Sequence, residues 1–222
     1  MALTGQSIKR KEDPRFITGK GRYTDDLVLP NQCYAHFVRS SVAHAEIKSV
    51  KIGDLESQPG VRRILTGRDY SESGLGTLMC GWMIHSKDGS EMKSGLHPPL
   101  VMEKARYVGD PIAVVIADTK EIARTTAENV EVEYEELEVI TLRNFDKKGT
   151  NLHDNAENNL AFDWELGDSN AVKKAAALSA HQIPLTIYNN RLAPNAMETR
   201  CLNAYYDERD DRFTLYIASQ NP

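Results

Sequence analysis

Several common signatures of function are missing from these 222 residues. There are only three cysteines, Cys33, Cys80 and Cys201, and their odd number and wide spacing exclude a disulfide framework and favour a reducing compartment. No Cys-x-x-Cys pair occurs, so the chain lacks the usual ligand spacing for an iron–sulfur cluster or a structural zinc.

Long apolar runs and an excess of positive charge are also missing. The longest apolar run, 111–117, is far too short to span a bilayer, and the N-terminus lacks the pattern of a signal peptide. We therefore expect a cytoplasmic protein without a membrane span. The net charge of −5 argues against a nucleic-acid partner, and the basic residues between 9 and 22 are more consistent with a solvated arm or a subunit contact.

Sequence motifs for several other chemistries are absent as well. There is no Gly-x-Ser-x-Gly elbow and no Walker motif, and Gly19-Lys-Gly21 lacks the third glycine of a dinucleotide fingerprint. The six histidines lack the spacing of metal ligands and are interpreted as structural or surface residues. A Ser-His-Asp triad stays open, because its members need not be adjacent in sequence.

Hydrophobic periodicity predicts a mixed α+β chain. The Asp118-Thr-Lys-Glu121 sequence has the spacing of a capping box, and apolar residues then recur at helical spacing up to Val130. A second helix is expected over 171–180, with Asp168 or Ser169 as its cap. Strands are predicted at 33–39, 45–53, 61–66, 111–117, 132–139, 183–190, 201–207 and 212–218.

Five glutamates alternate with apolar residues between 131 and 138. Such a run is either a cation site or the solvated face of a strand. Because the apolar residues between them follow the period of a strand, we favour the solvated face.

Composition also suggests where the chain is divided. Residues 1–31 predict an extended arm with turns and no helix. Residues 71–100 hold five glycines and predict an irregular excursion that packs on another domain or chain, and 141–165 has the composition of a linker. The expected parts are an N-terminal arm over 1–31, a domain over 32–145, and an incomplete second region over 146–222.

Eight short segments, in order along nearly the whole chain, carry a resemblance to a known family. They are Gly5 to Arg15, Thr18 to Asp26, Val38 to Ile47, Arg106-Tyr-Val-Gly-Asp-Pro111, Val130 to Tyr134, Trp164-Glu-Leu-Gly-Asp168, Met197-Glu-Thr-Arg200 and Thr214 to Pro222. Together they resemble the molybdenum hydroxylase large subunit, as in xanthine dehydrogenase, aldehyde oxidase and carbon monoxide dehydrogenase. Ser41-Val42 departs from the family, which more often has Pro-His in this loop.

This resemblance implies a fold and a function. The fold is an α/β hammerhead domain over 32–145, followed by the first segment of a molybdopterin-binding domain. The function is oxidation of an aldehyde, N-heterocycle, related small substrate or carbon monoxide by a molybdopterin cofactor, which the chain would share with the remainder of the subunit. Expected partners are that remainder, an iron–sulfur subunit with 2Fe-2S clusters and a flavin subunit with FAD, in a dimer of heterotrimers. The substrate and the electron acceptor are not specified.

The resemblance implies a cofactor contact for one residue of this chain. Gln220 matches the glutamine whose side-chain amide approaches an oxygen ligand of molybdenum, a role that suits a neutral donor. Without the motif, Gln220 would be interpreted as a turn residue. We interpret Glu198 and Arg200 as a buried structural pair and expect no catalytic residue in the chain.

The family's glycine-rich loop, substrate-positioning loop and C-terminal glutamate base are not found in this sequence. Without that base there is no proton acceptor, so we expect the chain alone neither to bind the cofactor tightly nor to turn over. We expect either a truncated chain or a naturally split subunit. The alternative is a non-catalytic hammerhead scaffold or assembly module, with 71–100 as its binding surface.

Overall fold

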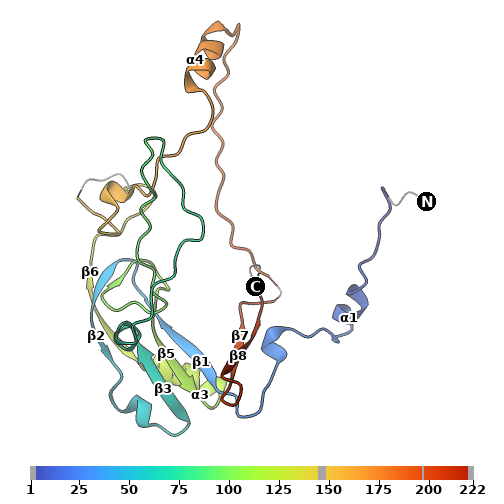
Figure 1. The fold of residues 1–222 in the computed structure, drawn as a ribbon, viewed down its shortest axis with the longest axis vertical. Coiled ribbons are helices and arrows are strands. Elements are labelled where there is room, and N and C mark those ends of the chain that lie inside the picture. Colours follow the sequence, from blue (N-terminus) through green and yellow to red (C-terminus); the bar gives the residue numbers. More distant parts are fainter. Residues whose placement is uncertain (1–3, 145–148, 197, 220–222) are drawn as a thin grey trace. The chain divides into compact units, whose positions relative to one another are not determined.

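A computed structural model describes residues 4–144, 149–196 and 198–219. The chain divides into two compact units. One comprises 33–182, and the other combines the described residues of 1–32 with those of 183–222. Figure 1 shows the elements of both units along the chain.

The larger unit contains two antiparallel sheets of three strands each. In the first sheet, β5 (Pro111–Ala117) lies between β1 (Tyr34–Arg39) and β3 (Val61–Thr66). Its central position explains its continuous apolar sequence, since Ile112, Ala113, Val115 and Ala117 are all fully buried. The strand expected over 61–66 is confirmed, and its first and last residues are those predicted.

The second sheet has the order β4–β2–β6, with β2 (Ala45–Lys51) between β4 (Lys104–Ala105) and β6 (Glu131–Glu136). The strands on either side of α3 (Lys120–Glu128) therefore belong to different sheets and are not a parallel βαβ unit. This mixture of helices and antiparallel sheets confirms the α+β expectation.

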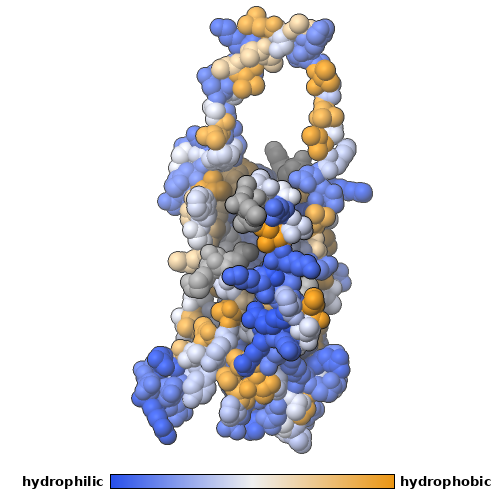
Figure 2. Space-filling view, turned by 90° about the vertical axis from the view of Figure 1, so that its right-hand side faces the viewer, coloured by the Kyte–Doolittle hydropathy of each residue, from blue (hydrophilic) through white to orange (hydrophobic). Residues whose placement is uncertain are grey.

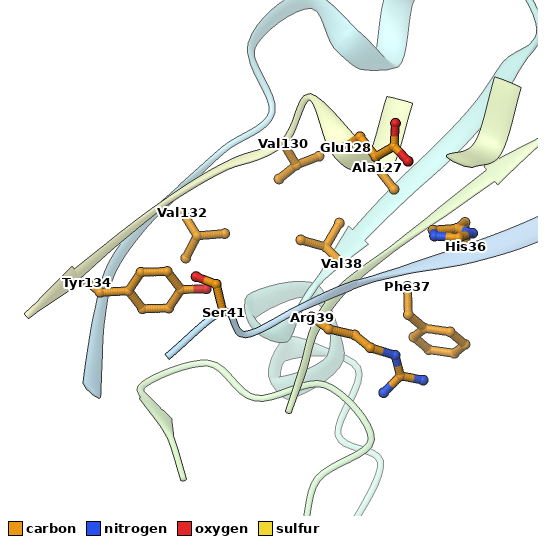
Figure 3. A pocket seen from close by; sticks show the side chains of 10 residues that line it. All are labelled: His36, Phe37, Val38, Arg39, Ser41, Ala127, Glu128, Val130, Val132 and Tyr134. Atoms are coloured by element: carbon orange, nitrogen blue, oxygen red, sulfur yellow. The ribbon is translucent and has the colours of Figure 1, made fainter. Parts of the chain in front are cut away.

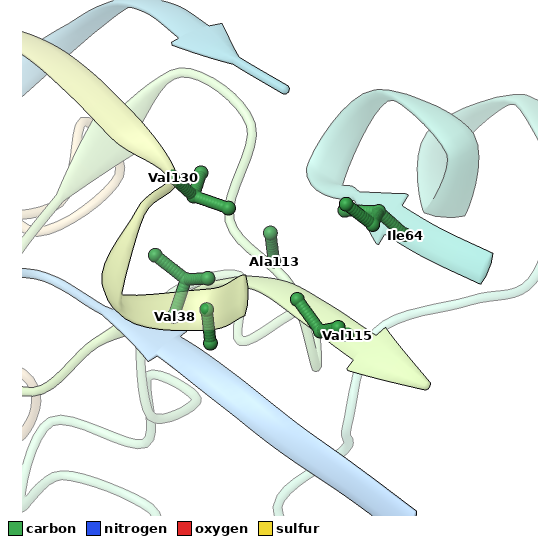
Figure 4. Close-up of a cluster of buried hydrophobic side chains, with 6 residues drawn as sticks. Val38, Ile64, Ala113, Val115 and Val130 are labelled. Atoms are coloured by element: carbon green, nitrogen blue, oxygen red, sulfur yellow. The ribbon is translucent and has the colours of Figure 1, made fainter. Parts of the chain in front are cut away.

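The core of this unit lies where α3 packs on β1 and β5. Its buried cluster combines Val38, Ile64, Ala113, Val115 and Val130 with Ala127 of α3. Figure 4 shows Val38, Ile64, Ala113 and Val115 on three strands, together with Val130 from the segment that follows α3. Burial of Ala123, Thr126 and Ala127 on one face explains the helical period of this segment.

The start of α3 differs from the expected capping box by one residue. Thr119 is the N-cap, and its hydroxyl accepts a hydrogen bond from the Ile122 N–H at 3.1 Å. The Asp118 carboxylate instead receives two hydrogen bonds from Arg62, at 2.5 Å and 3.1 Å. The sequence pattern located the helix, but a cross-strand partner for Asp118 decided which residue caps it.

Short helices flank the sheets. The 3-10 helix η2 (Gly53–Ser57) precedes β3, and α2 (Gly67–Glu72) follows it. The α2 helix was not expected, although Thr66 and Asp69 form a capping box at its start. Residues 73–100 are irregular apart from a bridge between His85 and Glu91, which confirms the excursion.

The segment after β6 holds two more helices, η3 (Glu157–Asn159) and α4 (Ser169–Leu178). The Asp168 carboxylate caps α4 by accepting from the N–H groups of Asn170 and Ala171, as expected. Every residue of α4 is exposed, and Figure 2 shows hydrophobic side chains at the surface around it.

The smaller unit contains the antiparallel hairpin β7 (Leu202–Asp207) and β8 (Arg212–Ile217), together with α1 (Asp13–Ile17) and η1 (Thr24–Asp26). The expectation that 1–31 holds no helix is wrong. Pro14 lies in the first turn of α1, where its fixed φ suits a helix and its missing N–H costs no hydrogen bond.

The strand predicted over 183–190 is also wrong. These residues form no ladder with any described strand, and Ile183 and Ile187 are exposed. A strand depends on hydrogen bonds to a neighbouring strand, so an alternating sequence alone does not create one.

No helix in the part of the chain described here combines the length and apolarity needed to cross a membrane.

Candidate functional site

The residue expected to contact the cofactor, Gln220, lies outside the described residues. Within 4–144, 149–196 and 198–219, no three His, Cys, Asp or Glu side chains come together in a way that could hold a metal ion.

Glu198 and Arg200 do not form a buried pair, and that interpretation is corrected. Arg200 is exposed, and the Glu198 carboxylate accepts hydrogen bonds from the backbone N–H and the hydroxyl of Thr24, both at 3.1 Å. The contact spans 174 residues of sequence, so local spacing could not reveal it. Glu198 thus holds the N-terminal segment against the segment that leads into β7.

The Arg106-Tyr-Val-Gly-Asp-Pro111 motif folds as a tight turn before the central strand β5. The Asp110 carboxylate is buried and accepts from the Arg106 backbone N–H at 3.0 Å, while the Asp110 N–H donates to the Tyr107 carbonyl at 3.2 Å. Gly109 has a φ of +94°, a conformation that favours glycine. Burial, followed by the charge of Asp110, raises the pKa of Tyr107.

The Arg106 side chain leaves this turn and binds two backbone carbonyls. Its Nε donates to the Leu152 carbonyl oxygen at 3.0 Å, and its Nη1 donates to that of Lys104 at 3.3 Å. Leu152 belongs to the segment expected to link the two parts of the chain. The motif that carried the family resemblance therefore anchors that segment, a role that the sequence did not indicate.

The irregular excursion also docks on this linker segment. Lys93 N–H donates to the Ala161 carbonyl at 2.9 Å, Lys87 N–H donates to the Asp163 carbonyl at 2.7 Å, and Asn155 Nδ2 donates to the Ser94 carbonyl at 3.0 Å. Lys87 Nζ also pairs with the Asp163 carboxylate at 2.7 Å.

His153 lies within this contact, against Gly95. Burial, then the positive charge of Arg106 and His97, lower the pKa of His153 below its usual range, and the nearby carboxylates of Asp154 and Asp110 oppose the shift. A neutral ring is therefore favoured where the excursion meets the linker.

His44 is the most buried histidine of the described chain. Its Nδ1 lies 2.7 Å from the Glu138 carbonyl oxygen, so Nδ1 must be the donor. Its Nε2 is buried and has no hydrogen-bond partner among the described residues. His44 thus joins the turn after β1 to the end of β6 and is structural, as interpreted from the sequence.

A groove of about 340 Å³ runs along β1, where Val38, Val130, Val132 and Tyr134 meet. Figure 3 shows Val38 pointing toward Val130, whereas Phe37 and Arg39 point to the other side of β1. The lining of the groove also includes the polar residues His36, Arg39, Ser41 and Glu128, and no group of three possible metal ligands lies among the described residues. We assign it no chemistry.

The acidic strand is the solvated face of a sheet, as favoured from the sequence. Lys48 of β2 pairs with Glu46 and Glu135, and Lys51 pairs with Glu133 and Glu131. These hydrogen bonds raise the pKa of Lys48 and lower that of Glu133. Lysines thus neutralise part of the carboxylate row, and no cation is needed.

Two protein families match the chain in sequence order. Residues 18–138 match the family described as "Aldehyde oxidase and xanthine dehydrogenase, a/b hammerhead domain", and residues 152–222 match "Molybdopterin cofactor-binding domain". The first match covers the two three-stranded sheets, and the second begins at Leu152, whose carbonyl oxygen accepts a hydrogen bond from Arg106.

Curated relatives and a solved structure agree with these matches. The nicotine 6-hydroxylase large subunit of Paenarthrobacter nicotinovorans is 29% identical over 99% of this chain and 26% of its own length. The carbon monoxide dehydrogenase large chain of Hydrogenophaga pseudoflava is 32% identical over 100% of this chain and 28% of its own. The quinoline 2-oxidoreductase structure from Pseudomonas putida 86 superimposes with a TM-score of 0.80 and 31% identity, over 97% of this chain and 27% of the other.

The chain therefore spans about a quarter of the length of these relatives. Its sheets and helices match the α/β hammerhead fold of the first family, and the matched residues continue into the start of the molybdopterin-binding domain. The chain belongs to the molybdenum hydroxylase large-subunit family that includes xanthine dehydrogenase, aldehyde oxidase and the carbon monoxide dehydrogenase large chain, and it corresponds to the N-terminal portion of that subunit.

Proposed function

We propose that the chain is the N-terminal part of the catalytic, molybdopterin-binding subunit of an oxidoreductase. The enzyme would hydroxylate an aldehyde, an N-heterocycle or a related small substrate, or oxidise carbon monoxide. The observation that carries this proposal is the order of the two matches, a hammerhead domain followed by a cofactor-binding domain. Relatives named for nicotine, quinoline and carbon monoxide support the range of substrates.

When bound, the molybdopterin cofactor would supply the oxidation–reduction chemistry, and the protein would position it. The described residues hold no cluster of three His, Cys, Asp or Glu side chains that could bind a metal ion, and no reaction step is assigned to them. Gln220 is the one residue that we propose as a contact, because a side-chain amide donates hydrogen bonds without adding charge near the metal. The remainder of the subunit would complete the site.

We further propose that an iron–sulfur subunit with 2Fe-2S clusters and a flavin subunit with FAD carry the electrons away, in a dimer of heterotrimers in the cytoplasm. This proposal rests on the family resemblance. Within this chain, Cys33, Cys80 and Cys201 are not joined by a disulfide, and no Cys-x-x-Cys pair occurs.

Metal analysis tests the proposal. We expect the purified 222-residue chain to hold far less than one molybdenum per chain, and its complex with the remainder of the large subunit to hold about one. A complex that assembles without molybdenum or pterin would favour the non-catalytic scaffold. Stoichiometric molybdenum on the isolated chain would contradict the expectation that this part alone does not bind the cofactor.

Gln220→Ala tests the cofactor contact in the assembled enzyme. Loss of a side chain that orients metal ligands typically lowers activity or metal affinity about 10- to 100-fold, and we expect a loss of turnover in that range. Gln6→Ala, at an exposed position in the N-terminal segment, is the matched control and should leave turnover unchanged. Equal turnover of both variants would remove Gln220 from the site.

A further inference from the structure

One face of the hairpin β7–β8 is apolar apart from the Tyr206 hydroxyl, which donates to the Asp211 carboxylate at 2.7 Å. Its register places Leu202 opposite Ile217, Ala204 opposite Leu215, and Tyr206 opposite Phe213. Directly opposed residues point to the same face of a sheet, and alternate residues along a strand share that face. The six side chains together make a continuous surface, which we call the hairpin apolar face.

This face is open in the chain. All six of its residues are exposed, and the five large side chains range from 43% exposure at Tyr206 to 70% at Phe213. On the opposite, more polar face, the chain buries Asn203, whereas Tyr205 and Tyr216 are 50% and 44% exposed. Asn203 there is 9% exposed and donates to Gln32 Oε1 at 2.8 Å and to the Leu27 carbonyl at 3.3 Å.

A sheet usually buries its apolar side, whereas this hairpin leaves its apolar side open. A hairpin of two strands is also only marginally stable in water by itself. Apolar and more polar residues alternate along β7 and β8. This is the pattern of a sheet whose apolar face packs against a second layer. The N-terminal segment contacts the other face, at Asn203, so it is not that layer.

We propose that the hairpin apolar face is the docking surface for the rest of the molybdopterin-binding subunit, which would lay an apolar layer of its own against it. The proposal rests on the function proposed above. The hairpin lies inside the segment that matches the cofactor-binding domain, and the relatives carry most of their length beyond the portion that this chain matches. A domain is completed by packing layers around one core.

The size of the face argues for this occupant over a second copy of the chain. A standard interface between separate proteins uses about 20–30 residues on each side, and this face offers six. Such a face suits one part of a larger domain core, where further contacts surround it.

The experiment uses the chain and the polypeptide that completes its large subunit, each with its own tag. Leu215→Lys places a charge on the hairpin apolar face, and Tyr216→Lys places the same charge on the next residue of β8, on the opposite face. Both side chains are exposed, at 55% and 44%. We expect Leu215→Lys to weaken association at least tenfold and Tyr216→Lys to change it less than twofold.

Circular dichroism of each isolated variant checks that it is folded. If Leu215→Lys unfolds, Phe213→Ser removes apolar surface from the same face without adding a charge and should weaken association too. Hydrogen exchange gives a second measurement, because amides of 212–217 should exchange at least tenfold more slowly in the complex than in the isolated chain.

The outcomes separate this proposal from the proposed function. Equal association of Leu215→Lys and Tyr216→Lys would overturn the docking surface, while molybdenum in the complex would still support the function. Association that depends on Leu215 in a complex without molybdenum would support the surface and contradict the function. A dimer of the isolated chain that Leu215→Lys abolishes would assign the face to a second copy and overturn the proposal.

Discussion

The guanidinium of Arg106 is hydrogen-bonded through Nε to the carbonyl oxygen of Leu152, at 3.0 Å. The first residue belongs to the turn that leads into β5, and the second is the first residue matched to the cofactor-binding domain. This bond links the hammerhead domain to the start of the segment that follows it. Both residues belong to the same compact unit, so this hydrogen bond forms without any other part of the subunit.

Arg106→Lys tests this anchor. A lysine lacks the planar guanidinium group with its several N–H donors, so it cannot make both hydrogen bonds to the backbone carbonyls. We expect the free energy of unfolding to fall by about 1.5–3 kcal/mol, the range for hydrogen bonds to charged groups. Urea denaturation measures this change, and hydrogen exchange should rise at 152–160. Arg124→Lys, on the exposed face of α3, is the control and should have little effect.

Gly95→Ala tests the contact between the excursion and the linker. A Cβ at Gly95 would overlap the ring of His153, whereas a Cβ at Gly81 would meet nothing within 4 Å. Overpacking typically costs about 1–3 kcal/mol, so we expect Gly95→Ala to lower the melting temperature and Gly81→Ala to leave it nearly unchanged. Equal melting temperatures would show that the His153 ring moves aside without cost.

Thr24→Val tests the contact with Glu198. The substitution keeps the shape of the side chain but removes the hydroxyl that donates to the Glu198 carboxylate. We expect a loss of about 1–2 kcal/mol of stability, and faster cleavage by trypsin after Lys20 and Arg22. Thr199→Val, at an exposed position beside Glu198, is the control. Unchanged cleavage in Thr24→Val would mean that the backbone N–H bond alone holds this segment.

The parts of the fold that followed from the sequence are those set by local pattern. The run 111–117 is apolar because β5 is buried between two strands, and α4 begins where Asp168 caps it. The helix α1 was missed because it is only five residues long. The segment 183–190 has the pattern of a strand, but pairing depends on a partner that no described segment provides.

The contacts around the candidate site depend on residues far apart in sequence. Arg106 and Leu152 are separated by 46 positions, and Thr24 and Glu198 by 174. Neither residue type nor spacing points to such partners. The interpretation of Glu198 with Arg200 failed for this reason, since it paired neighbours in sequence when the true partner was distant.

The lowered pKa of His153 has a consequence for stability. Burial and the charges of Arg106 and His97 disfavour the protonated ring in the folded chain, whereas the unfolded chain has the ordinary pKa of about 6.5. The unfolded state therefore binds more protons in the window between the two pKa values. Stability contributed by His153 is present above pH 6.5 and is lost as the pH falls toward the folded pKa.

His153→Gln should flatten this part of the pH profile. We expect the wild-type free energy of unfolding to decrease between pH 7 and pH 5 more steeply than that of His153→Gln, as measured by urea denaturation at each pH. His36→Gln, at an exposed position on β1, is the control and should keep the wild-type slope. If His153→Gln also keeps the wild-type slope, the acid sensitivity arises from other groups, and the His153 ring does not couple protonation to the contact between the excursion and the linker.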